Sequence, residues 1–291
     1  MRHTEGHFTT PDGANIYAQA WLPDDAPSSG VPQAIILIVH GLGDHSGRYS
    51  NYVNYFVPRG YALYSFDTRG HGRSSGPRGY IDRFDQFVAD IDQRAAEARS
   101  DWPGTPLFVL AHSLGSLMGL SYARQHPDRL TGLITSGTAL EDALQLPAWK
   151  RSLAAVLSRV TPSLKINNGV PLSGLSHDPA VAAAFKADPL THSWGTPRLA
   201  TEAEVTRAQI RQAAPTWRVP TLMLHGGSDP VCVAAGARQF AAQTPPGLVE
   251  YHEYAGLYHE IHNEAERTQV FAEIEAWLMA RLRAVGELPF R

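Results

Sequence analysis

Residues 108–116 read FVLAHSLGS, an apolar run that leads into small residues around a serine. A helical pattern follows, so the sequence predicts a strand, a sharp turn and a helix in this order. This is the setting of a nucleophile elbow, in which the turn holds a serine in a strained backbone conformation. The elbow needs small residues two places before and after the serine, and Ala111 and Gly115 supply them, with alanine in place of the usual glycine. Ser113 is therefore a candidate nucleophile, although a serine after a strand is more often a helix cap.

Short apolar runs of this kind recur along the chain. They occupy residues 34–39, 61–66, 107–111, 133–135 and 221–224, with a weaker run at 249–254. Runs that are apolar on both faces are typical of parallel strands covered by helices, and helical stretches such as 84–98 and 117–125 lie between several of them. The sequence therefore predicts an α/β fold with right-handed crossovers and a mostly parallel central sheet flanked by helices.

The alternation of strands and helices fails between about residues 138 and 215, where no strong strand pattern is found. Stretches 178–187 and 201–213 look helical. An apolar stripe with helical spacing precedes them and consists of Leu146, Trp149, Leu153, Val156, Leu157 and Val160. We interpret this region as a helical cap inserted over the sheet. The predicted division has three parts, which are the first part of the core at 1–137, the cap at 138–215 and the second part of the core at 216–291.

A serine hydroxyl becomes a nucleophile when a base takes its proton and an acid orients that base. In the α/β-hydrolases, whose nucleophile elbow this segment resembles, the acid and then a histidine follow the serine along the chain, and such sites lie at the carboxyl edge of the sheet. Asp229 and His259 follow the last two strand runs. His262 is a competitor three residues further along, while His112 adjoins Ser113 and is expected to point away from the turn. This order predicts a triad of Ser113, Asp229 and His259, although Asp229 alone would also suit a turn cap.

Attack on a carbonyl group also needs backbone N–H groups that stabilise the developing negative oxygen. One donor is expected from Leu114, directly after the serine, and a second from the loop after the first central strand. That loop reads HGLGD at 40–44, and the glycines on both sides of Leu42 allow its backbone to approach a substrate closely. Leu42 and Leu114 are therefore the candidate oxyanion donors, with a plain glycine-rich turn as the alternative for the first loop.

Two other motifs are weighed and set aside. His259 and His262 enclose Glu260 and Ile261 in the order HEIH, whereas the zinc motif H-E-x-x-H places its histidines four residues apart. The segment 67–74 reads DTRGHGRS, which lacks the spacing of either common phosphate-binding loop. Its Asp, Arg and Gly residues are expected to fix a turn after a strand. No metal site and no cofactor are therefore expected.

The composition argues against several classes of protein. The 291 residues carry 25 Lys and Arg against 28 Asp and Glu, and this net charge of −3 argues against a nucleic-acid-binding protein. A hydrophobic fraction of 43% supports a globular core, while the single cysteine excludes an intramolecular disulfide framework. The first residues lack a signal-peptide pattern, and the longest dense apolar run, 34–39, is far shorter than the roughly 20 residues of a membrane span. We therefore expect a cytoplasmic protein.

Three motifs make the sequence resemble the α/β-hydrolase superfamily, and more narrowly the monoacylglycerol lipase group, over nearly the whole chain. They are HGLGDHSGRY at 40–49, DTRGHGRS at 67–74 and HSLG at 112–115. The segments LSHDP at 175–179 and ADPL at 187–190 in the expected cap are also similar to that group. The resemblance implies an α/β-hydrolase fold with a helical cap.

The resemblance also implies roles for individual residues. It assigns Ser113 as the nucleophile, Asp229 as the acid and His259 as the base of a catalytic triad. It assigns the oxyanion hole to the backbone of Leu42 and Leu114. These are the same residues that the order of the strands predicts.

Further residues match positions near the glycerol end of the substrate in relatives. In relatives, the loop after the H-G-x-G motif carries an acid and an arginine, which are matched here by Asp44 and Arg48. The acid is often a glutamate, which is longer than Asp44. His262 matches a histidine that can join them. Cys232 matches a thiol near the site in some relatives, although a small buried residue without a catalytic role is the favoured interpretation.

We therefore expect a serine hydrolase that cleaves carboxylic esters through an acyl-enzyme, with monoacylglycerols as the favoured substrates. A lysophospholipase or a broad short-chain carboxylesterase is the alternative, and a non-catalytic ligand-binding protein with a hydrolase fold is a third. The expected partner is a small lipid ester and not a nucleic acid. The apolar cap residues are expected to form an acyl tunnel, and the cap is a candidate for transient contact with a membrane surface. The sequence leaves the oligomeric state open.

Overall fold

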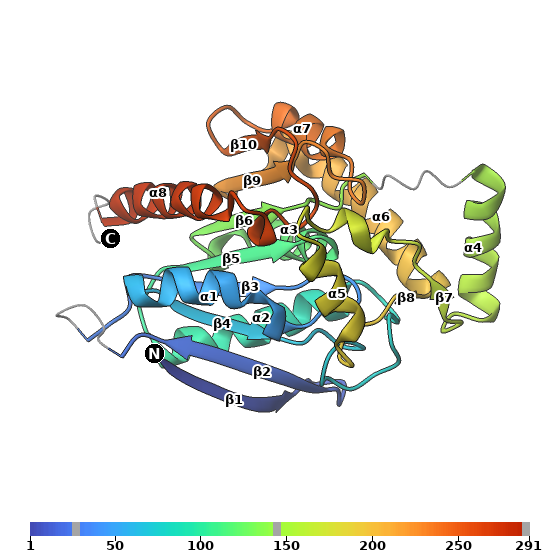
Figure 1. Cartoon of the computed structure of the whole chain (residues 1–291), viewed down its shortest axis with the longest axis horizontal. Helices are drawn as coiled ribbons and strands as arrows, with labels where there is room; N and C mark the ends of the chain where they lie inside the picture. Colours follow the sequence, from blue (N-terminus) through green and yellow to red (C-terminus); the bar gives the residue numbers. More distant parts are fainter. Residues whose placement is uncertain (25–29, 142–146, 287–291) are drawn as a thin grey trace.

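The strands of the central sheet are β1 (Arg2–Thr9), β2 (Asn15–Leu22), β3 (Ile35–Val39), β4 (Ala62–Phe66), β5 (Leu107–His112), β6 (Gly132–Ser136), β9 (Thr221–Gly226) and β10 (Val249–Tyr254). Within residues 1–24, 30–141 and 147–286, which the computed structural model describes, they form one sheet in the order β1-β2-β4-β3-β5-β6-β9-β10 (Figure 1). The first two strands are an antiparallel hairpin and β2 pairs antiparallel with β4, whereas the other neighbours are parallel. The predicted α/β fold with a mostly parallel sheet is confirmed.

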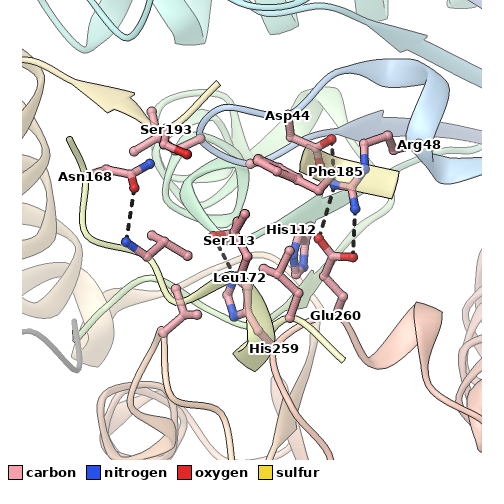
Figure 2. Close-up of a pocket in the computed structure, with 15 residues that line it drawn as sticks. Asp44, Arg48, His112, Ser113, Asn168, Leu172, Phe185, Ser193, His259 and Glu260 are labelled. Carbon is pink, nitrogen blue, oxygen red and sulfur yellow. Dashed lines mark hydrogen bonds and ion pairs between the residues drawn. The ribbon is translucent and has the colours of Figure 1, made fainter. Parts of the chain in front are cut away.

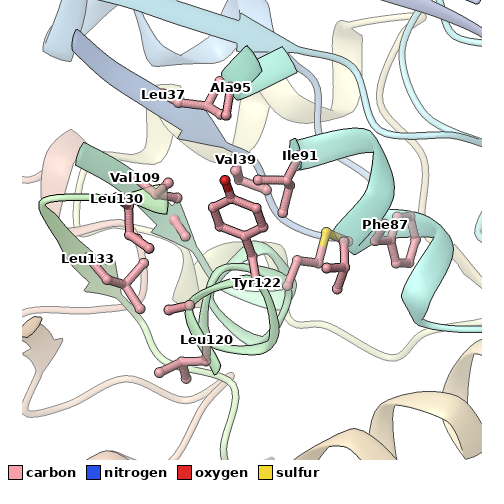
Figure 3. Packing of buried hydrophobic residues seen from close by; sticks show 14 of the residues in the cluster. Leu37, Val39, Phe87, Ile91, Ala95, Val109, Leu120, Tyr122, Leu130 and Leu133 are labelled. Atoms are coloured by element: carbon pink, nitrogen blue, oxygen red, sulfur yellow. The ribbon is translucent and has the colours of Figure 1, made fainter. Parts of the chain in front are cut away.

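Helices cover both faces of this sheet, as the apolar strands require. On one face lie α1 (Ser50–Phe56) and α8 (Arg267–Gly286), and on the other lie α2 (Asp85–Asp101), α3 (Leu114–Gln125) and α7 (Ala234–Gln243). Figure 3 shows how α2 and α3 pack on the second of these faces. The strands contribute Leu37, Val39, Val109 and Leu133, and the helices contribute Phe87, Ile91, Ala95, Leu120 and Tyr122. This packing fixes the carboxyl ends of the strands, where the candidate residues lie.

Two of these helices are not predicted by the sequence. α1 has only seven residues, and about two turns are too few for a periodic apolar stripe to be recognised. The buried face of α7 consists of Gly236, Ala237 and Phe240, and this face carries only one large apolar side chain. Both helices are defined by what they pack against and not by their own pattern.

Between β6 and β9 the chain leaves the sheet. It forms α4 (Ala148–Val160), α5 (Pro179–Ala187), α6 (Pro197–Ala213) and a short antiparallel pair, β7 (Ile166–Asn167) and β8 (Trp194–Gly195). The sequence predicts the helices but not the two-residue strands. The division of the chain into core and cap at residues 138 and 216 stays a prediction. Residues 142–146 of the predicted cap, which include Leu146, and residues 287–291 of the predicted core lie outside the described residues.

The apolar stripe of α4 is exposed. Trp149, Val156 and Val160 are 64%, 57% and 73% accessible to solvent. The helix uses its other side to pack on α6, where the Ser158 hydroxyl lies 2.8 Å from the hydroxyl of Thr201. In Figure 1, α4 stands at the edge of the molecule beside α6, away from the sheet. The expectation that this stripe lines an acyl tunnel is therefore wrong for these side chains.

Candidate active site

Ser113 lies at the turn between β5 and α3, as the elbow motif predicts. Its φ of 56° and ψ of −126° make it the one non-glycine residue with a positive φ in the described part of the chain. Hydrogen bonds hold this backbone from both sides. Ser113 N donates to Ser136 O at 3.0 Å, and Ser113 O accepts from Ser116 N at 2.8 Å and from Ser116 Oγ at 2.5 Å. A positive φ in a residue with a side chain costs energy and persists where the surroundings enforce it. The serine is thus held in a strained, fixed position.

The alanine that replaces the usual glycine of the elbow is accommodated from the helix side. A Cβ atom at Gly119 of α3 would lie 2.9 Å from the Cβ of Ala111, closer than two carbon atoms normally approach. The room that Ala111 needs is therefore provided by the missing side chain of Gly119. Since the helix can pack closely on β5 in this way, the departure from the usual motif leaves the turn intact.

Asp229 and His259 meet Ser113 at the same edge of the sheet. His259 Nδ1 lies 2.7 Å from Asp229 Oδ2, and His259 Nε2 lies 2.9 Å from Ser113 Oγ. A carboxylate only accepts hydrogen bonds, so Nδ1 carries the proton and Nε2 is free to accept the proton of the serine hydroxyl. All three predicted triad residues are therefore brought together, each after its own strand, within hydrogen-bonding distance.

The Asp229 carboxylate is buried and remains ionised. Its Oδ1 accepts hydrogen bonds from the backbone N–H groups of Val231 and Cys232 at 2.8 and 3.0 Å. Burial by itself raises the pKa of Asp229, but the charge of His259 and hydrogen bonds from His225, His259 and the backbone of Cys232 lower it well below its usual range. Cys232 therefore contacts the acid through its backbone, and its side chain is buried.

A cavity opens beside the serine and the histidine (Figure 2). In Figure 2 the charged side chains of Asp44, Arg48 and Glu260 gather on one side of Ser113. The cap contributes Asn168, Val170, Leu172, Leu175, Phe185 and Ser193 to the lining, and the core adds Gly41, Leu42, His112 and Val231. The cavity thus has a charged end and a lining with several apolar side chains, with the serine between them.

The loop after β3 lies against the elbow. A Cβ atom at Gly41 would lie 2.9 Å from the Cβ of Ser113, so only glycine allows this approach. Leu42 follows it and lines the cavity, and Leu114 is the first residue of α3. The two candidate oxyanion donors therefore lie on adjacent segments next to the serine, and one of them is at a helix N-terminus, where backbone N–H groups are unpaired.

Asp44 and Arg48 form an ion pair at the charged end of the cavity. Arg48 Nη1 donates to Asp44 Oδ1 at 3.0 Å, and the hydroxyl of Tyr49 donates to Asp44 Oδ2 at 2.9 Å. Burial raises the pKa of Asp44, but the charges of Arg48 and His40 and hydrogen bonds lower it overall. Both residues line the cavity, and Asp44 is engaged by protein groups, so their contact with substrate stays a prediction.

His262 lies beneath the site and is not among the residues that line the described cavity. Its ring is stacked on those of Tyr49 and Tyr52 at 5.3 and 5.1 Å and meets the ring of His112 edge-on at 4.9 Å. Burial lowers the pKa of His262 to about 4, so its ring is neutral near pH 7. A direct contact of His262 with substrate stays a prediction, and its position supports the rings around it.

Two residues that sequence reasoning did not assign lie in the site. The ring of His112 lies 4.7 Å from the ring of His259, and its Nδ1 is 3.0 Å from Ser136 Oγ. Glu260 lines the cavity and receives two hydrogen bonds from Arg48. The one available signal for Glu260 is its place directly after His259, where the sequence offers it only as part of a zinc motif.

The loop that carries His259 is bonded to the cap. His259 N donates to Gly174 O at 3.3 Å and Glu260 N donates to Leu175 O at 2.7 Å. The buried carboxylate of Glu264 accepts from Ser176 Oγ and His177 N, each at 3.0 Å. The residues after η4 (Leu172–Gly174) are thereby held against residues 259–264.

Comparison with known proteins agrees with this geometry. The family model described as Serine aminopeptidase, S33 matches residues 30–266. A monoacylglycerol lipase of Mycolicibacterium smegmatis is 30% identical over 280 residues, which are 96% of this chain and 98% of the relative. A monoglyceride lipase of Homo sapiens is 29% identical over 285 residues, with 96% and 92% of the two chains covered. The crystal structure of the Paleococcus ferrophilus monoacylglycerol lipase has a TM-score of 0.80 at 28% identity and covers 97% of this chain and 100% of its own. The chain therefore belongs to the serine aminopeptidase S33 family of α/β-hydrolases, and it is a monoglyceride lipase-like hydrolase that acts on esters.

Proposed function

We propose that this ester hydrolase cleaves monoacylglycerols to a fatty acid and glycerol through a triad of Ser113, Asp229 and His259. The observation that carries the proposal is the position of the His259 ring, whose nitrogens lie 2.9 Å from Ser113 Oγ and 2.7 Å from Asp229 Oδ2. The substrate class is supported by the relatives, which are named as lipases of monoacylglycerols.

In the proposed reaction, His259 Nε2 takes the proton of Ser113 while the serine Oγ forms a bond to the ester carbonyl carbon. Asp229 stays ionised and stabilises the imidazolium, and the N–H groups of Leu42 and Leu114 bind the oxyanion. The bond from carbon to the glycerol oxygen then breaks, and His259 returns its proton to that oxygen. Water attacks the acyl-enzyme with His259 again as the base, which releases the fatty acid and restores the serine.

The lining of the cavity suits a substrate with one polar and one apolar end. Asp44 and Arg48 provide charged hydrogen-bonding groups for glycerol hydroxyls on one side of the serine. Val170, Leu172 and Leu175 of the cap provide apolar surface for an acyl chain. The ester would then lie across Ser113 with its glycerol toward Arg48.

Comparison of substrates that share one acyl chain tests the proposal. We expect kcat/KM on 1-monooleoylglycerol to exceed that on oleoyl lysophosphatidylcholine by at least about tenfold, or about 1.4 kcal/mol in transition-state binding. p-Nitrophenyl esters of increasing chain length report the activity without a glycerol group. Equal or faster turnover of the lysophospholipid, or of short p-nitrophenyl esters alone, would favour the alternative activities over the proposed one.

We also propose that α4 brings the enzyme to the surface of a lipid membrane. Its exposed apolar side chains, Trp149, Val156 and Val160 among them, follow one side of the helix. Exposed basic residues, Lys150 and Arg159, lie on the same helix. An apolar face combined with basic residues is typical of helices that lie in a membrane interface. No described helix combines the length and the hydropathy of a membrane-spanning segment.

A double substitution of Val156→Asp and Val160→Asp is expected to lower binding to vesicles of phosphatidylcholine and phosphatidylglycerol by at least about tenfold, since each change removes apolar burial of roughly 1.5 kcal/mol or more. Sedimentation with vesicles measures this. Met279→Asp places one of these two negative charges on another exposed apolar residue, on α8, and should bind as the wild type does. Unchanged binding of the α4 variant would mean that another surface makes the contact.

The composition supports two further proposals. A single cysteine and a nearly balanced charge suit an enzyme of the cytoplasm. A net charge of −3 suits a small uncharged lipid ester as partner rather than a nucleic acid.

A further inference from the structure

The charged end of the cavity contains one positive and two negative side chains, Arg48, Asp44 and Glu260, which we call the charged cluster. Arg48 Nη1 donates to Asp44 Oδ1 at 3.0 Å and to Glu260 Oε1 at 3.2 Å, while Nη2 donates to Glu260 Oε2 at 3.1 Å. Both hydrogens of Nη1 and one of Nη2 are therefore occupied by carboxylates. The cluster carries a formal charge of −1 and lines the same cavity as Ser113 and His259.

The cluster is buried and held in place from several sides. The side chains of Asp44, Arg48 and Glu260 are only 6%, 11% and 4% exposed. The ring of Phe185 lies 4.9 Å from the Arg48 guanidinium carbon. Asn263 Nδ2 donates to Glu260 Oε2 at 2.6 Å. Charges in such a place are weakly screened by solvent, so one unit of charge changes the binding of a charged ligand strongly.

The charged groups described near the cluster do not add a second positive side chain that is free to bind a phosphate. His45 Nε2 lies 2.9 Å from Asp188 Oδ2, which places another carboxylate on the cap side of the loop. Arg48 is close enough to Asp188 to contribute to lowering its pKa. A phosphate group in the cavity would thus meet the two carboxylates of its lining and an arginine whose hydrogen-bonding groups are mostly occupied, with the Asp188 carboxylate nearby outside the lining.

We propose that Glu260 makes the enzyme selective for esters with an uncharged headgroup, by neutralising Arg48 and making this end of the cavity anionic. The proposal rests on the function proposed above and adds to it a named specificity residue. Arginine binds phosphate through two parallel N–H···O bonds when its face is open. Without Glu260, Arg48 would keep only Asp44 as a partner and offer such a face to a glycerol phosphate. With Glu260 present, an unionised glycerol fits and a phosphomonoester is repelled.

A series of variants that changes the cluster charge stepwise tests this. The wild type has a cluster charge of −1, Glu260→Gln and Asp44→Asn each have 0, and the double variant has +1. The substrates are 1-monooctanoylglycerol and 1-octanoylglycerol 3-phosphate, which share the acyl group and are used as monomers in solution. Because both substrates transfer the same acyl group to Ser113 from a primary alcohol oxygen, effects on the triad cancel in the ratio of their kcat/KM values.

We expect the ratio of kcat/KM for the phosphate ester to that for the neutral ester to rise at least tenfold per unit of charge. Glu266 is an exposed residue directly before α8, outside the cluster. Glu266→Gln removes the same unit of charge from the protein and should leave the ratio unchanged. p-Nitrophenyl butyrate, which has no glycerol, reports whether each variant is folded and active. Either single variant suffices if the other fails to fold.

Two results would overturn the inference. One is a wild-type enzyme that cleaves the phosphate ester as fast as the neutral ester, and the other is a ratio that stays constant in variants active on p-nitrophenyl butyrate. A wild type that cleaves p-nitrophenyl butyrate but not 1-monooctanoylglycerol would instead contradict the proposed function, so the two failures are distinguishable.

Discussion

Ser113→Ala is expected to lower kcat on monoacylglycerols by about 10⁵-fold or more, because no other group can form the acyl-enzyme. In the wild type, His259 Nε2 lies 2.9 Å from Ser113 Oγ. The variant lacks this oxygen, so His259 would have no hydroxyl from which to take a proton. KM should change little, since the serine hydroxyl contributes mostly to the transition state. Hydrolysis of 1-monooleoylglycerol, followed by titration of released fatty acid, measures the loss.

Ser121→Ala is the matched control for this prediction. Ser121 is a buried serine of the same helix, α3, and its hydroxyl accepts a hydrogen bond from Gln125 at 3.3 Å. We expect it to keep activity close to that of the wild type. A fluorophosphonate probe should label the wild type and Ser121→Ala but not Ser113→Ala. Esterase activity that survives in Ser113→Ala would contradict the acyl-enzyme mechanism.

Ser113 also has a measurable cost to stability. Its φ of 56° is a conformation that glycine adopts freely. Ser113→Gly should therefore be as inactive as Ser113→Ala and yet more stable than it, by about 1 kcal/mol in the free energy of unfolding. Urea unfolding of both variants measures the difference.

Asp229→Asn is expected to lower kcat by about 10³- to 10⁴-fold, the second largest effect. The amide is neutral, so it no longer stabilises the imidazolium that forms when His259 takes the serine proton. Its NH2 group can also donate to His259 Nδ1, which favours the tautomer with the proton on Nε2. In that tautomer Nε2 cannot accept the proton of the serine. The charge of His259 and hydrogen bonds hold the pKa of Asp229 well below its usual range, so the wild type should keep this carboxylate charge through the pH range in which an ordinary aspartate titrates.

Ser228→Ala is the matched control, because Ser228 is exposed and directly precedes Asp229. It should retain wild-type rates. Ser113 of Asp229→Asn should still react with the fluorophosphonate probe, but slowly, whereas an unfolded variant would not react at all. Rates within tenfold of the wild type for Asp229→Asn would show that Asp229 does not act as the orienting acid.

The triad and the core of the fold can be predicted from the sequence for one reason. Parallel strands that are apolar on both faces must be covered by helices, and their carboxyl ends then lie along one edge. Residues in the loops after these strands, Ser113, Asp229 and His259, are thereby placed near each other even though 146 positions separate the first from the last. The pattern of the strands therefore predicts where these residues lie, and their side-chain types predict the role of each.

The remaining features depend on contacts that no local pattern encodes. Glu260 meets Arg48 across 212 positions of sequence, and neither residue signals the other. The stripe of α4 has helical spacing, but spacing shows only that one side of a helix differs from the other. Whether that side is buried is decided by what packs on α4, and here Ser158 contacts α6 while Val156 and Val160 face solvent.

The bonds between the cap and the loop of the catalytic histidine limit how this enzyme can be recombined. Gly174 and Leu175 accept hydrogen bonds from His259 and Glu260, and Glu264 accepts from Ser176 and His177. A chimera whose cap lacks counterparts of Ser176 and His177 would leave the buried Glu264 carboxylate with the backbone N–H of Tyr258 but without its hydrogen bonds from the cap, which is costly. The cap and residues 257–264 therefore form one exchangeable unit, although more than 80 positions separate Ser176 from Glu264 along the chain. Grafts that transfer both segments together should keep the base in place, and grafts of a cap without counterparts of Ser176 and His177 should lose it.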